Sequence, residues 1–581
     1  MEFKFIDNVI NDLSIDLEVL TKDTNLYTTL LFQHKGSFIA EATRFGNNED
    51  CTDKFNAFFT LAKSKNSSLA LTPEYSCPWN SIEWLLENEE RLPNQSKLWA
   101  ICCESITPHE IRTFKENHEN ENTIVYFDEN ALNNGGAGVL LDPLCYVFKA
   151  EQNGINKIII LIQFKTVHMG VWGSPEERKK YIFGDNIYVL RNSPNSIFLF
   201  SNICSDATNF SISDRFQEQI DNRWDDNPYI ILNPQMNPKP SHDYFVNFRK
   251  TILKYSNKDV ITLNWAGKTM CPGKAEPLIE LSKSSILFKT NDVEFDSDTR
   301  FINNHSKGLY YMHSKPKIHY YYLNPYAEVF LISNQKPSSA GANTALIRRT
   351  GPEAMNVYKW NGEDIDFDDI NVLEDGFADF LDEYQCSNKI FLDSQINFID
   401  KERLINLSLG NVTTKGDDKG WHKIDRLETF QVDANEKIKR LAYVYDELSL
   451  EDRKRYLDII EDINSKILTD ENLLPDSLSS FKNNCSEVMF FKKGTSYDYK
   501  YNLVTNDSKR KATIAYTGRN TKALARRTYD KLRNLFEEDK YQSRKMVVVW
   551  YKEGGSNIYN ISATKKPDAT DDSTDKPNSI F

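Results

Sequence analysis

The strongest constraint on the fold is a series of short apolar segments that alternate with helical stretches between residues 27 and about 335. Near-continuous apolar runs of this length are typical of strands in sheets that are covered on both faces. Helical stretches between them, such as the amphipathic segment 53–64, indicate a layered α/β arrangement. The clearest runs are YTTLLFQ (27–33), SLALTP (68–73), KLWAICC (97–103), TIVYF (123–127) and KIIILIQF (157–164).

The chain has 581 residues, which is too long for one compact core, so several domains are expected. Residues 334–354 are rich in small and turn-forming residues and predict a boundary. We therefore expect an α/β domain over 1–335, a linker with an acidic segment over 336–430, a helical hairpin over 431–485, a basic α+β domain over 486–560 and a disordered tail over 561–581.

Two apolar stripes at a spacing of three to four residues predict the helical hairpin. Ser449 and Asp452 have the spacing of an N-cap for the second helix. The stripes consist of Ile438, Leu441, Tyr445 and Leu448, and of Leu457, Ile460, Ile463 and Ile467. Before them, residues 362–383 hold ten Asp and Glu residues and no Lys or Arg.

The segment 492–545 is basic although the chain as a whole has a net charge of −13. It contains 15 Lys and Arg residues against 6 Asp and Glu residues. Cations beside exposed tyrosines can contact phosphates and stack on bases, so a nucleic-acid partner is one hypothesis. Docking against the acidic segment 362–383, within or between subunits, is the other. The candidate contact residues are Lys509, Arg510, Lys511, Arg519, Lys522, Arg526 and Arg527.

The nine cysteines form no CxxC pair, and several lie inside the apolar runs. This pattern is typical of reduced thiols in an intracellular protein. No run approaches the roughly 18 apolar residues of a membrane span. The first residues lack a cationic region followed by an apolar one, so no secretion signal is expected. We therefore expect a cytoplasmic protein without a membrane partner.

Three of the apolar runs are followed closely by one reactive side chain: Glu74, Lys165 and Cys204, in that order. A thiol can attack an amide or nitrile carbon once a base takes its proton. Glu74 is the candidate base, and Lys165 is the candidate cation for the oxyanion that develops. Burying a carboxylate and an ammonium together is costly, which favours a functional reason for the pair.

The local motifs resemble those of the carbon–nitrogen hydrolase superfamily, which includes the nitrilases and aliphatic amidases. Pro73-Glu74 matches the family's PE dipeptide after a strand. The lysine segment FKTVHM (164–169) and the cysteine segment ICSD (203–206) match the family's other two motifs in the same chain order. Downstream, Arg249, Asn264 and Gly267 occupy matching places, so the resemblance covers roughly residues 25–335.

The resemblance implies a four-layer αββα sandwich, followed here by a helical segment and a small basic α+β C-terminal domain. It also implies an amidase or nitrilase activity through a cysteine acyl-enzyme, no metal or organic cofactor, and a homo-oligomer. Many family members carry a second glutamate between the lysine and the cysteine, and here Glu176 and Glu177 are both candidates. The C-terminal part has no counterpart in a simple nitrilase.

Two alternatives remain open at this point. A Cys–His hydrolase would use His168 or His242 as the base for Cys204. A retained fold can also serve as a binding module, so an effector or scaffold is a second hypothesis. Nitrilase-like domains occur beside defence-related reverse transcriptases in bacteria, so a role in an antiphage complex with such a partner is conceivable by analogy.

Overall fold

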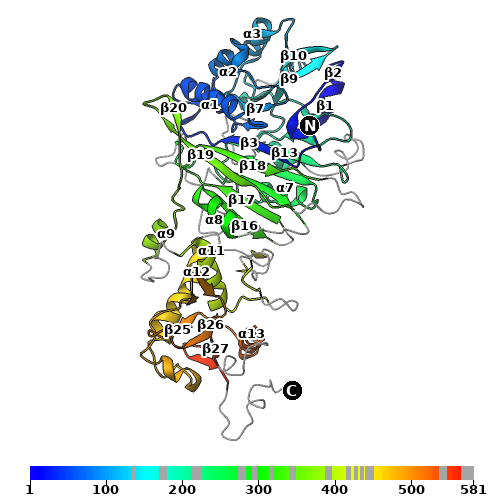
Figure 1. The fold of residues 1–581 in the computed structure, drawn as a ribbon. Helices are drawn as coiled ribbons and strands as arrows, with labels where there is room; N and C mark the ends of the chain where they lie inside the picture. The colour runs from blue at the N-terminus through cyan, green and yellow to red at the C-terminus, as the bar shows by residue number, and fades with distance from the viewer. Residues whose placement is uncertain are drawn as a thin grey trace. The chain divides into compact units, whose positions relative to one another are not determined.

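The computed structural model describes residues 1–133, 139–168, 179–210, 224–271, 283–290, 298–314, 318–338, 349–385, 396–413, 420–423, 430–431, 437–438, 450–535 and 546–563. The chain divides into two compact units. The first consists mainly of residues 1–311 and 316–375, and the second mainly of residues 376–443 and 448–581. Each unit is described separately below (Figure 1).

One large sheet of the first unit has parallel strands at its centre. Its order is β1 (Glu2–Phe5), β11 (Asn186–Arg191), β12 (Phe198–Ser201), β13 (Tyr229–Pro234), β14 (Lys258–Leu263), β15 (Ser285–Lys289), β17 (Ile318–Leu323) and β16 (Leu309–Ser314). Strands β12, β13 and β14 run parallel, so their carboxyl ends meet at one edge. Ligands of open α/β sheets usually bind at such an edge.

The other large sheet has the order β20 (Asp366–Asp369), β19 (Glu353–Asn361), β18 (Val329–Gln335), β3 (Leu26–Phe32), β6 (Leu69–Leu71), β7 (Leu98–Cys102), β9 (Pro143–Gln152), β10 (Ile155–Phe164) and β8 (Thr123–Tyr126). Strand β2 (Leu13–Ser14) pairs with β9 beside this path. Strands β3, β6 and β7 are parallel. The expected boundary at 335 falls between β18 and β19, which pair directly, so this sheet continues past it.

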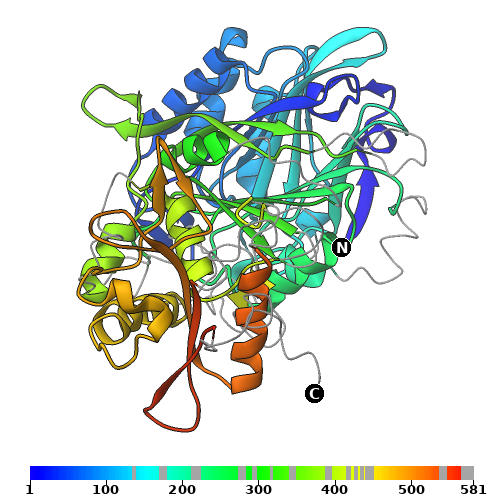
Figure 2. The ribbon, with the colours of Figure 1, turned by 60° about the horizontal axis from the view of Figure 1, so that its bottom comes forward.

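Helices α1 (Thr52–Lys65), α2 (Trp79–Leu86) and α3 (Pro108–His118) lie together beside β3 and β7 (Figures 1 and 2). Their apolar residues share one core with the strands of the second sheet, including Phe58, Ile82 and Ile111. On the first sheet, α7 (Asp243–Ile252) contacts β14, and Phe248 of α7 meets Phe210 edge to face. Apolar strands covered by helices are what the sequence pattern predicts, and the mixed α/β class is confirmed.

A buried glutamine of β10 joins the two sheets. Nε2 of Gln163 donates a hydrogen bond of 2.9 Å to the carbonyl of Ser201 on β12. Its Oε1 accepts one of 3.1 Å from the backbone N–H of Tyr188 on β11. A buried amide needs such partners, and here they fix the end of β10 against the end of β12.

The second unit contains α9 (Phe377–Tyr384), α11 (Phe398–Ser408), α12 (Leu450–Asp462) and a sheet of four strands. The sheet order is β25 (Leu503–Val504), β26 (Lys511–Arg519), β27 (Val547–Lys552) and β28 (Ile558–Ile561). Strands β26 and β27 are parallel, and α13 (Lys522–Asn534) connects them. The hairpin of β23 (Phe491–Lys493) and β24 (Ser496–Asp498) precedes this sheet.

The second of the two predicted helices is present. Leu457 and Ile460 of α12, and Ile463 and Ile467 of the π-helical turn that continues it, are all buried. The first predicted helix does not include Ile438, which pairs instead in the short strand β22 (Lys437–Ile438). Residues 439–449, which include Ser449 of the expected N-cap, lie outside the described residues. The tail from 564 onward does so too.

Among the helices of the described ranges, none combines the length and the apolar character that a membrane crossing requires.

Candidate active site

Glu74 lies in the turn after β6 and is 0% exposed. Its Oε1 accepts a hydrogen bond of 2.6 Å from Nζ of Lys165, and its Oε2 accepts one of 2.6 Å from the backbone N–H of Met236. Its carbonyl accepts a third, of 2.7 Å, from the indole Nε1 of Trp265. Three distant segments therefore fix Glu74, two through its carboxylate and one through its backbone, just after a parallel strand of the second sheet.

Lys165 directly follows β10 and is 1% exposed. Besides the bond to Glu74, its Nζ lies 3.5 Å from Oδ2 of Asp142 and 5.5 Å from the ring centre of Tyr75. Its backbone N–H donates a hydrogen bond of 2.9 Å to the carbonyl of Asp142. One ammonium thus lies between two carboxylates, which compensates the cost of burying it.

Cys204 lies in the sharp turn between β12 and α5 (Asp206–Asn209) and is 0% exposed. Its φ of 40° lies in the left-handed region, which non-glycine residues rarely adopt. Its backbone N–H donates a hydrogen bond of 2.8 Å to the carbonyl of Pro234, and its carbonyl accepts one of 3.3 Å from Nδ2 of Asn233. Such strain collects at functional sites, and a strand–turn–helix elbow is a common support for a nucleophile.

Asp206 joins the turn of Cys204 to the turn of Lys165. Its Oδ1 accepts hydrogen bonds of 2.8 Å from both the N–H and the hydroxyl of Thr166, and one of 3.0 Å from the N–H of Val167. Burial raises the pKa of Asp206 to about 6, while the bonds to Thr166 and the charge of Lys165 act in the opposite direction. Ser205 adds a bond of 2.7 Å from its hydroxyl to the carbonyl of Val167.

These contacts close a ring around the site. Lys165 binds Glu74, Glu74 binds Met236, and the carbonyl of Pro234, two residues earlier, binds the backbone of Cys204. Asp206, two residues after Cys204, binds the residues that follow Lys165. The three predicted residues are therefore brought to one place through their own turns and those of their immediate neighbours.

The pKa of a second cysteine, Cys102, is affected by groups of the same site. Burial raises the pKa of the Cys102 thiol well above its usual value, and the charges of Asp142, Glu74 and Cys204 act in the same direction. Cys102 is the last residue of β7, next to β6 in the sheet. Glu74, Cys102 and Cys204 lie at or just after the carboxyl ends of β6, β7 and β12, and Asp142 directly precedes β9.

An aromatic cluster adjoins Glu74 and reaches the surface. Trp265 and Tyr75 contact Phe38, and Tyr75 also contacts Phe45, with ring centres 5.6–5.8 Å apart. Phe38 and Phe45 come from the hairpin of β4 (Phe38–Ala40) and β5 (Phe45–Asn47). The remaining buried members are Leu140, Tyr181 and Met236, and the partly exposed Ala40, Phe183 and Cys271 pack against them.

The downstream residues of the resemblance have structural roles. Arg249 of α7 is buried and donates a hydrogen bond of 3.1 Å to the carbonyl of Pro240. Asn264 exchanges two hydrogen bonds with the backbone of Asn237 and so supports the loop that carries Met236. A Cβ at Gly267 would lie 3.1 Å from the Cβ of Pro325, so the close approach of the two loops favours glycine.

Both histidines of the rival Cys–His hypothesis belong to the first unit. His168 is half-buried, with its ring 6.1 Å from that of Phe183. His242 caps α7, where its ring accepts a long hydrogen bond from the N–H of Tyr244. Glu176 and Glu177 lie outside the described residues. Within the described ranges, no group of three or more His, Cys, Asp or Glu residues could hold a metal ion.

The seven predicted basic contact residues do not form one patch. Lys509 and Arg510 precede β26, whereas Arg519, Lys522, Arg526 and Arg527 follow its other end. A strand of nine residues separates these groups by about 30 Å. Lys511 is engaged internally, because its Nζ lies 4.0 Å from the ring centre of Tyr501 and 3.4 Å from a carboxylate oxygen of Asp498.

The pattern of apolar runs did not reveal Asp142, Met236 or Trp265. Met236 acts through its backbone N–H, which carries no side-chain signal in a sequence. Trp265 contributes one hydrogen bond to a carbonyl 191 residues away. Asp142 is the one with a local signal, since it is an acid that stands alone between the apolar segments VLL and PLCYVF.

No family model and no curated protein matches this chain. Several solved structures match a little under half of it. An amidase from Nesterenkonia sp. matches with 11% identity and a TM-score of 0.26, over 46% of this chain and 85% of that one. A CN-hydrolase superfamily protein from Xanthomonas campestris, with an arsenic adduct in its active site, matches with 11% identity and a TM-score of 0.26, over 45% and 83%.

A mutant of the Nesterenkonia sp. AN1 amidase, with the acetamide moiety of fluoroacetamide added at its active-site cysteine, matches with 12% identity and a TM-score of 0.25, over 46% of this chain and 85% of that one. Each of these matches covers a little under half of this chain, and the C-terminal extension has no counterpart in them. TM-scores of 0.25 to 0.26 support no assignment of function. The function proposed below is therefore based on the side-chain contacts of the site.

Proposed function

We propose that this protein is a carbon–nitrogen hydrolase that cleaves an amide or a nitrile through the thiol of Cys204. In this proposal Glu74 is the general base and acid, and Lys165 stabilises the oxyanion. The N-terminal unit would form a four-layer αββα sandwich around them. No step of the proposed reaction draws on a metal or an organic cofactor.

The proposed reaction has two halves. Glu74 takes the thiol proton while the sulfur of Cys204 attacks the substrate carbon, and the ammonium of Lys165 neutralises the oxyanion. Collapse of this intermediate breaks the C–N bond, and Glu74 returns the proton to the departing amine. Glu74 then activates a water that hydrolyses the thioester and releases the carboxylic acid. A nitrile would first give a thioimidate, which adds one water to form a tetrahedral intermediate that releases ammonia and leaves the thioester.

The ion pair between Lys165 and Glu74 carries the proposal. The two side chains are both 0% exposed, and the N···O distance is 2.6 Å. A buried ion pair is weak evidence for stability, since apolar residues of similar volume usually serve as well. Its position beside a strained cysteine turn, to which hydrogen bonds tie both partners, supports a chemical role.

The surroundings favour a substrate with an apolar acyl group. The aromatic cluster adjoins Glu74 through Tyr75, its chain neighbour, and through Trp265. Two partly exposed members, Phe183 and Cys271, connect it to the surface. An apolar group gains free energy from contact with such rings, whereas a charged acyl group would lose its hydration there.

Intact-protein mass spectrometry after incubation with a set of amides and nitriles tests the proposal. We expect a covalent adduct on the wild-type protein and on the Cys485→Ala variant, whose partly exposed thiol lies in the second unit. We expect none on Cys204→Ala, which should also lack hydrolytic activity while its circular dichroism is unchanged. Hydrolysis by Cys204→Ala at the wild-type rate would refute the proposed nucleophile.

A second candidate is an effector or scaffold that keeps the fold without turnover, for example in an antiphage complex with a reverse transcriptase. The observation that favours it is the closure of the site, because Glu74, Lys165 and Cys204 are all at most 1% exposed. The adduct experiment separates the two candidates, since a scaffold leaves Cys204 unmodified by every substrate. Self-association into a homo-oligomer fits either candidate.

A further inference from the structure

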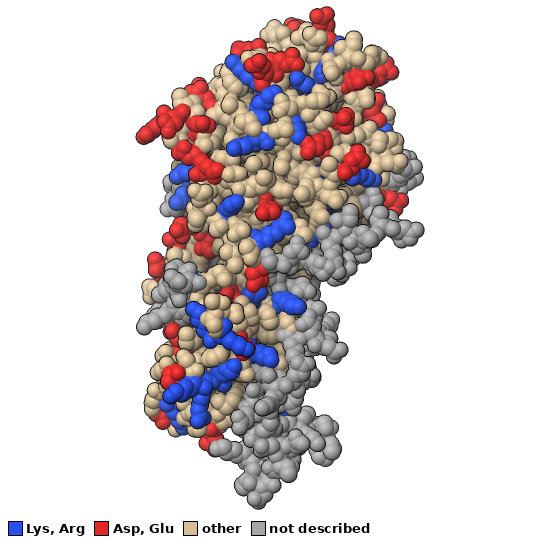
Figure 3. Space-filling view, in the orientation of Figure 1, with Lys and Arg blue, Asp and Glu red and all other residues tan. Residues whose placement is uncertain are grey.

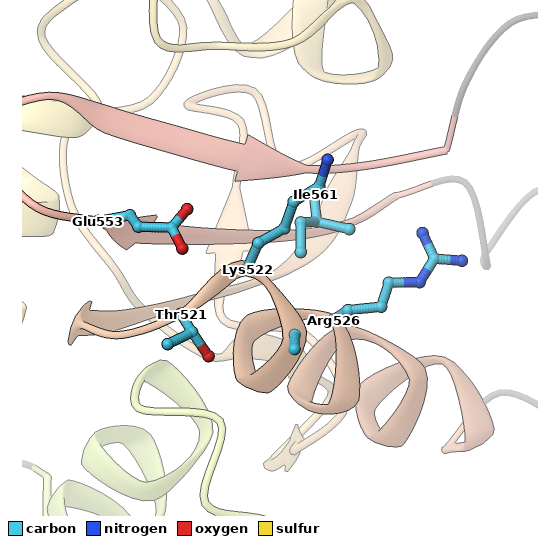
Figure 4. A pocket seen from close by; sticks show the side chains of 6 residues that line it. Thr521, Lys522, Arg526, Glu553 and Ile561 are labelled. Atoms are coloured by element: carbon cyan, nitrogen blue, oxygen red, sulfur yellow. The ribbon is translucent and has the colours of Figure 1, made fainter. Parts of the chain in front are cut away.

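Two of the basic residues that follow β26, Lys522 and Arg526, line a hollow in the second unit. Its volume is about 530 Å³, within the range of roughly 300–1,000 Å³ that ligand pockets occupy. Thr521, Lys522, Ala523 and Arg526 of the α13 region line one side. Figure 4 shows Lys522 and Arg526 projecting from successive turns of α13, with Glu553 directly after β27 and Ile561 at the end of β28.

Several cations at this edge have no acidic partner within the described part of the chain. Arg519, Lys522, Arg527 and Lys552 form no ion pair there, whereas Arg526 lies 3.4 Å from Asp530. Arg519, Lys522 and Arg527 are exposed, and Lys552 is half-buried. Figure 3 shows several blue side chains gathered on the surface of this unit. Among the residues that line the hollow, one is acidic, Glu553.

Two of these cations oppose each other across the sheet. Arg519 of β26 is the register partner of Lys552 of β27. Like charges that face each other across neighbouring strands reduce stability. An anion bound at the carboxyl ends of the two strands would remove this repulsion.

The same edge offers an aromatic ring. Tyr559 of β28 is 44% exposed, and its ring centre lies 5.7 Å from that of Tyr551 on β27. Cations that follow a phosphate backbone, together with exposed rings that stack on bases, are typical of proteins that bind single strands. The carboxylate of Glu553 in the hollow would repel a bare anion, but it accepts hydrogen bonds from the amino group of a base such as cytosine.

We propose that the edge formed by the carboxyl ends of β26 and β27 and the start of α13 binds single-stranded nucleic acid. The phosphates bind Arg519, Lys522, Arg527 and Lys552, and a base enters the hollow beside Glu553 and stacks near Tyr559. Lys509, Arg510 and Lys511 take no part, because they lie beyond the other end of β26 or make internal contacts.

Fluorescence anisotropy with the full-length protein and a labelled oligodeoxycytidylate of about 16 nucleotides tests this site. Four phosphate contacts predict that log K falls with log salt with a slope of about −3. The charge reversal Arg519→Glu/Arg527→Glu should weaken binding at least tenfold and make the slope less steep. Tyr559→Ala should weaken binding with the slope unchanged.

The matched control is Lys492→Glu/Lys493→Glu, which reverses two exposed cations of β23 and changes the net charge equally. It should bind like the wild type. Equal losses in the two charge-reversal variants would overturn the proposal, because they would reflect net charge alone. Displacement of the oligonucleotide by polyglutamate at equal charge concentration would also overturn it, in favour of an acidic protein partner.

Discussion

The ammonium of Lys165 and the carboxylate of Glu74 form a hydrogen-bonded ion pair of 2.6 Å with no exposed surface on either side chain. The two residues lie 91 positions apart and follow strands of the same sheet, β10 and β6. Asp142 lies 3.5 Å from the same ammonium, so the loss of either Lys165 or Glu74 disturbs the balance of three buried charges.

Glu74→Gln and Lys165→Met should each lower the free energy of unfolding by about 3–5 kcal/mol, because each removes one partner of a buried ion pair. The double variant should lose less than the sum of the two losses, because the two side chains interact directly. Chemical denaturation of the four proteins measures this coupling. Strictly additive losses would contradict a direct interaction between the two side chains.

The stability of the protein should fall as Asp206 ionises. Burial raises the pKa of Asp206 from 3.8 to about 6, so between these values the folded state holds a proton that the unfolded state has lost. The free energy of unfolding therefore decreases by about 3 kcal/mol as the pH rises from about 4 to 6, and this loss persists above pH 6.

Denaturant titrations of wild type and Asp206→Asn between pH 4 and 7 measure that change. The asparagine keeps an oxygen for the N–H groups of Thr166 and Val167 but does not titrate. The difference in stability between the two proteins should shift in favour of the variant as the pH rises. A constant difference would mean that Asp206 titrates alike in both states.

Asp142→Asn should lower kcat about 10- to 100-fold and leave KM nearly unchanged, because Asp142 positions the ammonium of Lys165 without lying against Glu74 in the contacts described. Steady-state kinetics on an amide that the wild type hydrolyses give both constants. Asp53→Asn, on the exposed face of α1, is the control and should match the wild type. A rise in KM alone would assign Asp142 to substrate binding instead.

Trp265→Phe should cost about 1–3 kcal/mol of stability, because it leaves the buried carbonyl of Glu74 without its donor at 2.7 Å. The ring contacts with Phe38 and His34 are largely kept. Thermal unfolding followed by calorimetry measures the loss. A variant with wild-type stability would show that the indole N–H contributes little in the folded state.

The elements of the first unit were predictable because their signal is local. Runs such as 157–164 are apolar throughout and have the length of a strand, and they appear as β10 and its neighbours. Glu74, Lys165 and Cys204 could be selected because each follows such a run within three residues. What the sequence shows here is the end of a buried strand, where polar groups can meet.

The supports of the site were not predictable, because they depend on contacts between distant segments. The bond from the Met236 N–H to Glu74 and that from the Trp265 indole exist only once the two sheets have come together. Ile438 illustrates the same limit in the second unit. It fits a helical stripe in the sequence, but its pairing with Phe430 places it in a strand.

The hydrogen bonds of Asp206 limit where the length of this chain can change. Because one carboxylate holds the backbone after Lys165 as well as the start of the Cys204 turn, an insertion or deletion in either loop would displace both reactive groups at once. Variation in chain length is therefore excluded at these two turns. The hairpin of Phe38 and Phe45 is linked to the Cys204 turn by none of the hydrogen bonds given for the described residues, so descendants of this sequence can diversify there.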